Sequence, residues 1–226
     1  MNLLSLARLL QLSSPTLPVG ACSYSQGLEW VVEQGIVTNE NTASQWIEQV
    51  LQQNIASFEA PWLVRLMVAW EAMDLDQLTM LNEDYIASRE TGELRAETLQ
   101  MGYSMTKLLD DLPDFPKEFC KPLKAMGQVS FPTAWNCAAA AWKINVKESL
   151  TAYLWAWLEN QVMAAVKAVP LGQTSGQKML MDLGGMLPVI VEQAMTMDDA
   201  MISNFAPGFA IASSRHEMQY SRLFRS

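Results

Sequence analysis

The sequence predicts an all-α fold, with a single helical-bundle domain of about eight to ten helices around a buried central helix at residues 148–168. Apolar residues recur at spacings of three and four over most of the chain, which is the period of a helix. No segment alternates strictly between apolar and polar residues, as a half-buried strand would. Half of the 226 residues are hydrophobic and only 17% are charged, so a sizeable core is expected.

The central helix is the strongest element in the sequence. Between Glu148 and Ala168, leucine, valine, tyrosine and tryptophan fill one face, and alanine and methionine fill most of the other. A helix that is apolar on nearly all sides is covered by neighbouring helices. Pro170 ends it, because proline lacks the N–H that the helix needs. Polar residues at 159–161 and Lys167 keep its longest apolar run well below the ~18 residues of a membrane span.

Shorter helices are expected before the central one. A first amphipathic helix begins near Leu3, and a second covers residues 22–34. Residues 75–110 are helical in pattern but must break near 88–92 to fit a compact domain. Four prolines between residues 111 and 132 predict a loop with one helical turn. Further breaks are expected at proline, glycine and helix-capping residues: Pro15, Pro18, Gly35, Asn41 or Thr42, Pro61, Met73 and Asp74.

Helix is expected to resume at Gln173, after the break at Pro170. The stretch 179–200 is rich in methionine and is interrupted at Gly184 and Gly185. A methionine-rich helical face is either adaptable core or a contact surface for a partner helix. Together with the low charged fraction, these faces predict self-association, and a two-fold homodimer is the commonest form.

The composition excludes several classes of function. A formal net charge of −9 is unfavourable for binding nucleic acid or anionic membranes, which attract basic patches. Three widely separated cysteines and one histidine predict neither a disulfide scaffold nor a metal site, and no cofactor is expected. The chain has no phosphate-binding glycine loop and no nucleophile beside a base, which indicates an interaction protein and not an enzyme. The first 15 residues lack a basic leader and a cleavage site, which predicts a cytoplasmic protein.

The end of the sequence differs in charge from the rest. Residues 213–226 carry three arginines and one glutamate, a net charge of +2, against −9 for the whole chain. Tyr220, Leu223 and Phe224 lie between the arginines, and aromatic and arginine residues are typical of binding hot spots. A frayed terminus is the ordinary alternative. We therefore expect a domain at 1–212 and a basic, aromatic tail at 213–226 that is poorly ordered alone and orders on a partner.

Five blocks of the sequence, in order along nearly the whole chain, resemble motifs of the urease accessory protein UreF family. The family motifs are LLQLSSPALPIGGF, YSQGLE, SRET.ELR, VKLVPLGQ…GQ and IASARHETQYTRLFRS. Residues 112–132 match none of them, and Ala21 and Cys22 stand where the family often has glycine and an aromatic residue. The corresponding blocks here are 10–20, 24–29, 88–95, 166–177 and 211–226.

This resemblance implies a function in urease maturation. It implies a chaperone or scaffold that bridges the accessory protein UreD (UreH) and the GTPase UreG, and that promotes nickel insertion into apo-urease without itself binding the metal. It also implies a homodimer. The alternative is a GTPase-activating protein for UreG that supplies a catalytic arginine. The arginines on matching motifs are Arg89, Arg95, Arg215 and Arg222.

Two groups of residues are candidates for partner binding. Lys167, Gln173 and Gln177, together with Glu29, are expected to contact the GTPase, although helix capping and a solvated helix face would also explain them. The second group lies in the tail and is expected to contact UreD: Arg215, His216, Tyr220, Arg222, Leu223 and Phe224.

Overall fold

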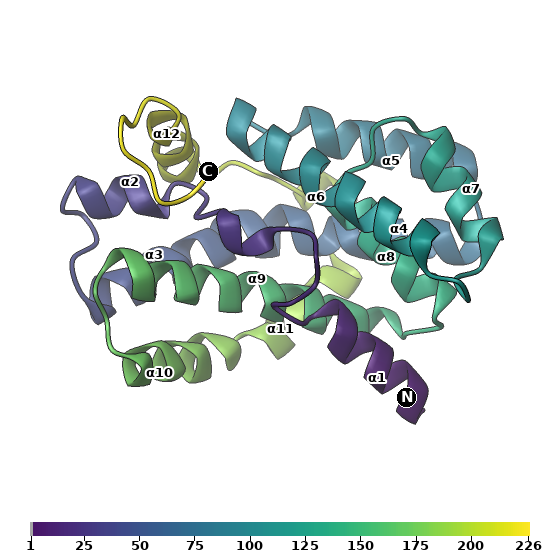
Figure 1. Cartoon of the computed structure of the whole chain (residues 1–226), viewed down its shortest axis with the longest axis horizontal. Coiled ribbons are helices and arrows are strands. Elements are labelled where there is room, and N and C mark those ends of the chain that lie inside the picture. The colour runs from purple at the N-terminus through teal and green to yellow at the C-terminus, as the bar shows by residue number, and fades with distance from the viewer. Residues whose placement is uncertain (1) are drawn as a thin grey trace.

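Residues 2–226 are described by a computed structural model, and their regular structure is entirely helical (Figure 1). Ten of the twelve α-helices contain ten residues or more, which confirms the all-α helical-bundle prediction. None of the helices in residues 2–226 has the length and hydropathy needed to cross a bilayer. In chain order the helices are α1 (Leu3–Leu12), α2 (Leu28–Glu33), α3 (Glu40–Val50), α4 (Ala60–Ala72), α5 (Leu75–Ala87), α6 (Gly92–Asp111), α7 (Lys117–Ala125), α8 (Phe131–Ala141), α9 (Val146–Ala168), α10 (Gln173–Gly184), α11 (Leu187–Thr196) and α12 (Pro207–His216).

The central helix is where the sequence predicts it. In Figure 1, α9 crosses the middle of the molecule, and it contacts α1, α2, α3, α4, α8, α10 and α11. Leu154, Leu158 and Val162 are completely buried in these contacts. The Asn145 side chain caps the start of α9, and the helix ends two residues before Pro170. The burial of this helix, predicted from its nearly all-round apolar pattern, is therefore confirmed.

Two segments differ from the expectation in their local structure. Residues 22–34 form a short 3₁₀ turn (Ala21–Ser23) and then α2, because Gly27 has a positive φ of 82° that interrupts a helix. The proline-rich segment 111–132 contains all of α7, which continues past Pro122. Burial of Cys120 and Leu123 against the core holds this helix in place despite the proline.

A wide helical turn joins α3 to α4. Residues Leu51–Glu59 form a π-helix, so the chain is helical from Glu40 to Ala72 and does not restart at Pro61 as expected. The end of this π-helix places the carboxylate of Glu59 inside the bundle, where the residue is buried. π-Helical turns frequently occur at functional sites.

The end of the sequence packs onto the body of the protein. Helix α12 lies against α2 and α6, and it spans the boundary between residues 212 and 213 that the sequence suggested. His216, Phe224 and Ser226 are buried. Polar side chains beside these three residues bind groups in the helical body. The charge pattern of the sequence does not predict which groups these are. That this segment orders on a partner stays a prediction.

Candidate functional site

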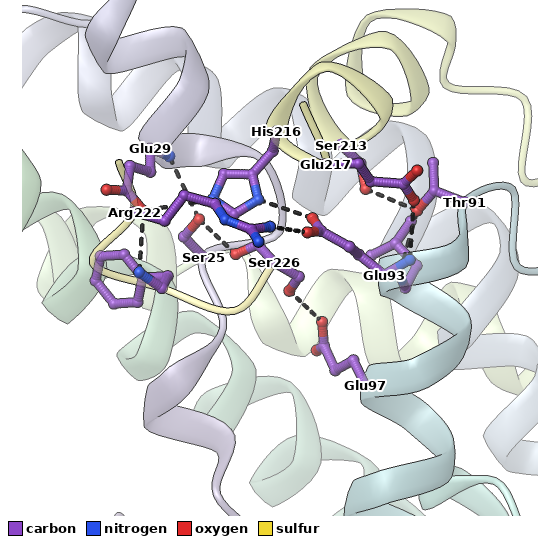
Figure 2. Close-up of polar contacts among 12 residues, drawn as sticks. Ser25, Glu29, Thr91, Glu93, Glu97, Ser213, His216, Glu217, Arg222 and Ser226 are labelled. Atoms are coloured by element: carbon purple, nitrogen blue, oxygen red, sulfur yellow. Dashed lines mark hydrogen bonds and ion pairs between the residues drawn. The ribbon is translucent and has the colours of Figure 1, made fainter. Parts of the chain in front are cut away.

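Three segments that are far apart in the sequence meet in one polar cluster (Figure 2). They are residues 25–29 at the start of α2, residues 91–97 at the start of α6, and residues 213–226 in α12 and the segment that follows it. Each segment lies within or overlaps one of the sequence blocks described above. We call this group the tail cluster.

Glu29 holds the last residues of the sequence in place. Its Oε1 accepts a hydrogen bond of 2.7 Å from the main-chain N–H of Leu223, and its Oε2 accepts one of 3.0 Å from that of Phe224. The Nε2 atom of His216 lies 3.3 Å from the same Oε2. Because Glu29 is itself buried, each of these contacts lies in a medium of low polarity and is stronger than in water.

His216 lies between two carboxylates and has no exposed surface. Its Nδ1 atom lies 2.7 Å from Oε2 of Glu93, opposite the Glu29 contact. Each ring nitrogen of His216 therefore faces a carboxylate oxygen. Arg222 binds the other oxygen of Glu93, and Glu217 accepts a 3.0 Å hydrogen bond from the main-chain N–H of Glu93 at the start of α6. The acidic body and the basic tail are thus complementary in charge here.

Ser226 joins the other end of the cluster. Its main-chain oxygen accepts hydrogen bonds of 2.6 Å from both the N–H and the hydroxyl of Ser25, and one of 3.0 Å from the N–H of Gln26. Its hydroxyl donates to Oε2 of Glu97 at 2.8 Å, and the Gln26 amide donates to Oε1 at 2.7 Å. Burial raises the pKa of Glu97 to about 7, against the lowering effect of these two hydrogen bonds.

Gly27 allows α12 to approach α2 closely. A Cβ atom at this position would lie 2.7 Å from the main-chain nitrogen of Ser213 and 2.9 Å from the carbonyl carbon of Ala212. Only a residue without a side chain fits between these main-chain atoms. The hydroxyl of Ser213 also lies 2.8 Å from that of Thr91, the N-cap of α6.

The outward side of the same segment is apolar and basic. Tyr220 is fully exposed, and Leu223 is 75% exposed. Five exposed residues make up this side, which we call the tail surface: Ile211, Arg215, Met218, Tyr220 and Leu223. Aromatic and arginine side chains are common in the hot spots of protein interfaces.

Comparison with known proteins identifies the family. The UreF family model matches residues 37–184, more than half of the 226 residues. The chain belongs to the UreF family. It is 59% identical to the urease accessory protein UreF of Azoarcus sp. (strain BH72) over 227 residues, which cover 100% of this chain and 97% of the relative. It is 54% identical to the UreF protein of Dechloromonas aromatica (strain RCB), covering 99% of this chain and 98% of the relative.

The structure separates the residues expected to contact the GTPase. Lys167, Gln173 and Gln177 are exposed and lie around the junction between α9 and α10, as the sequence of this UreF family member suggested. The carboxylate of Glu29 instead binds Leu223, Phe224 and His216. The group at the α9–α10 junction is therefore a lysine and two glutamines.

The four candidate arginines lie in different environments. The side chain of Arg89 is buried, with its guanidinium 4.2 Å from the ring centroid of Tyr85 and 5.2 Å from that of Phe58. Arg222 is bound to Glu93. Arg95 and Arg215 are exposed. Only the last two are free to reach a partner without a rearrangement.

Several residues that build the tail cluster are not among the site residues that the sequence predicts. These residues are Glu93, Glu97, Ser25, Gln26 and Ser226. A partial signal was available, because residues 211–226 carry a net charge of +2 in a chain whose net charge is −9, so carboxylates elsewhere in the chain are natural partners for them. No group of three or more His, Cys, Asp or Glu within residues 2–226 is placed to hold a metal ion.

Proposed function

We propose that this UreF family member is a urease maturation scaffold that joins UreD (UreH) to the GTPase UreG and so promotes nickel insertion into apo-urease. The observation that carries the proposal is the tail surface, an exposed apolar and basic group on a segment seated by buried hydrogen bonds. The curated relatives carry the name urease accessory protein, which supports a role in the same process. The cytoplasm is the proposed compartment.

The tail surface is proposed to contact UreD. Replacing both Tyr220 and Leu223 by alanine should weaken UreD binding at least ~30-fold, because truncating an interface hot spot costs about 2 kcal/mol or more. Both side chains point away from the body, so the thermal stability of the free protein should stay unchanged. Isothermal titration with UreD measures the first effect, and scanning calorimetry the second.

The matched control replaces Tyr103 and Leu75, which are 65% and 46% exposed on α6 and α5. This control should bind UreD normally. Full-strength binding by the Tyr220 and Leu223 variant would place the UreD contact elsewhere. Hydrogen exchange of residues 213–226, with and without UreD, measures how far the segment orders on its partner.

The α9–α10 junction is proposed to contact UreG. Lys167→Ala should reduce capture of UreG by the complex with UreD, while the exposed Lys107→Ala on α6 should not. If Lys167 only complements the dipole at the end of α9, its loss should cost about 0.3–1 kcal/mol of stability and leave capture intact. Quantitative pull-down together with urea unfolding separates the two roles.

The alternative function, activation of GTP hydrolysis by UreG, is supported by the exposure of Arg95 and Arg215. Steady-state GTP turnover of UreG with the wild-type protein and with each arginine replaced by alanine decides between scaffold and activator. A two-fold homodimer is also part of the proposal. It rests on exposed apolar residues such as Met181 on α10 and Val189 on α11, and the mass of the free protein in solution tests it.

A further inference from the structure

A cavity of about 360 Å³ lies inside the bundle, next to the tail cluster. It is bounded by α5, α6, α8, α9, the π-helix and residues 13–22. Its volume falls in the range of about 300–1,000 Å³ that is usual for small-molecule sites. Much of the wall is apolar and aromatic, and it includes Leu12, Leu17, Met101, Phe131 and Trp135.

One part of the wall carries buried ionisable groups. The hydroxyl of Tyr153 donates to Oε1 of Glu59, and the guanidinium of Arg89 lies 3.6 Å from Oε2 of the same carboxylate. That distance is longer than a hydrogen bond. The Nε atom of Arg89 is buried and has no hydrogen-bond partner in residues 2–226. The wall therefore contains one buried donor without a partner, on a guanidinium beside the Glu59 carboxylate, which also contacts Tyr153 and Tyr85.

The charge of this wall restricts what it can hold. Arg89 and Glu59 offset one another, Glu159 and Lys167 at the rim are of opposite charge, and burial raises the pKa of Glu97 to about 7, which weakens its negative charge near neutral pH. A charged ligand would be removed from water without gaining a free counter-charge, which is costly. An uncharged ligand that both donates and accepts hydrogen bonds meets no such cost.

We propose that this cavity binds a small uncharged molecule that has a carboxamide-like donor and acceptor group and an apolar body. The carbonyl of the amide accepts from Arg89, its N–H donates to Glu59, and the apolar body packs against Phe131 and Trp135. Entry is between residues 13–22 and α9, where Pro15, Cys22 and Lys167 are exposed at the rim. The proposal does not depend on binding to UreD or UreG.

The cavity shares its wall with the tail cluster. Gln26 and Glu97 line the cavity, and both bind Ser226. The Trp157 indole donates to the Gln26 side chain at 2.9 Å, so its N–H signal reports on the same wall. A ligand in the cavity therefore shifts the signals of Trp157 and of Ser226 together.

Three probes of similar size and different charge test the proposal: benzamide, benzoate and benzylamine. Heteronuclear NMR titrations of the full chain follow the indole N–H signals of Trp135 and Trp157, with Trp70, which does not line the cavity, as the internal reference. Benzamide should bind in the millimolar range, and the two charged probes at least ~tenfold more weakly. Equal binding of all three, shifts confined to other residues, or no binding of benzamide would overturn the proposal.

Two variants test the location and the chemistry. Met163→Trp fills the half-buried rim position on α9 and should abolish benzamide binding, whereas Met181→Trp on the exposed face of α10 should not. Glu59→Gln removes the counter-charge of Arg89 and should reverse the preference, so that benzoate binds more tightly than benzamide. Benzamide binding that survives Met163→Trp contradicts the assigned site even if the Glu59 variant does not fold.

Discussion

Replacing Glu29 by alanine is expected to release residues 213–226 from the body of the protein. The change leaves two main-chain N–H groups and one ring nitrogen of His216 without their buried acceptor. Removing one partner from a buried ionic network costs about 3–5 kcal/mol. For a chain of this length, the melting temperature should fall on the order of 10 °C. Calorimetry measures this, and hydrogen exchange should show loss of protection at Leu223 and Phe224.

Glu33→Ala is the matched control for this experiment. Glu33 lies on the same short helix but is exposed, so its loss should change stability by less than about 0.5 kcal/mol. UreD binding should fall with Glu29→Ala, because the main chain that carries the tail surface is no longer held against the body of the protein. Normal protection of Leu223 and Phe224 in the Glu29 variant would show that the segment is held by other contacts.

Replacing Gly27 by alanine should displace α12. The positive φ at this position costs alanine about 1–2 kcal/mol. Its Cβ would also clash with main-chain atoms of Ala212 and Ser213, which can move only if α12 moves with them. Overpacking of this kind typically adds about 1–3 kcal/mol. Urea unfolding should therefore show a loss of about 2–5 kcal/mol, and the variant should bind UreD weakly.

Gly20 offers a control with the same backbone geometry. Its φ is also 82°, but a Cβ atom there would meet nothing within 4 Å. Gly20→Ala should therefore show the conformational cost alone, and it should keep UreD binding. The difference between the two variants isolates the contact between α2 and α12. Equal losses would mean that this contact contributes nothing.

Local signals in the sequence predicted most of the fold. The apolar pattern of α9, the stop before Pro170 and the break between α5 and α6 depend on neighbouring residues, and the structure confirms all three. The proline-rich segment 111–132 was harder to predict, because burial of Cys120 and Leu123 keeps α7 helical across Pro122. In that segment tertiary packing outweighs local preference.

The tail cluster could be predicted only in part. The sequence showed that residues 213–226 are basic and aromatic, but spacing along the chain carries no information about which distant carboxylates contact them. Glu29 was therefore grouped with Lys167, although its partners are Leu223, Phe224 and His216. Residues at the α9–α10 junction were easier to group, because they are neighbours in sequence.

The hydrogen bond between Ser25 and Ser226 spans 201 residues, and this separation orders events during translation. At about 5–20 residues per second, the ribosome releases residues 25–29 many seconds before it reaches the segment that binds them. Until then Glu29 lacks the main-chain N–H groups of Leu223 and Phe224 that it binds, and the tail surface has not been synthesised. A nascent chain therefore cannot recruit a partner through this group before its helical body has been synthesised.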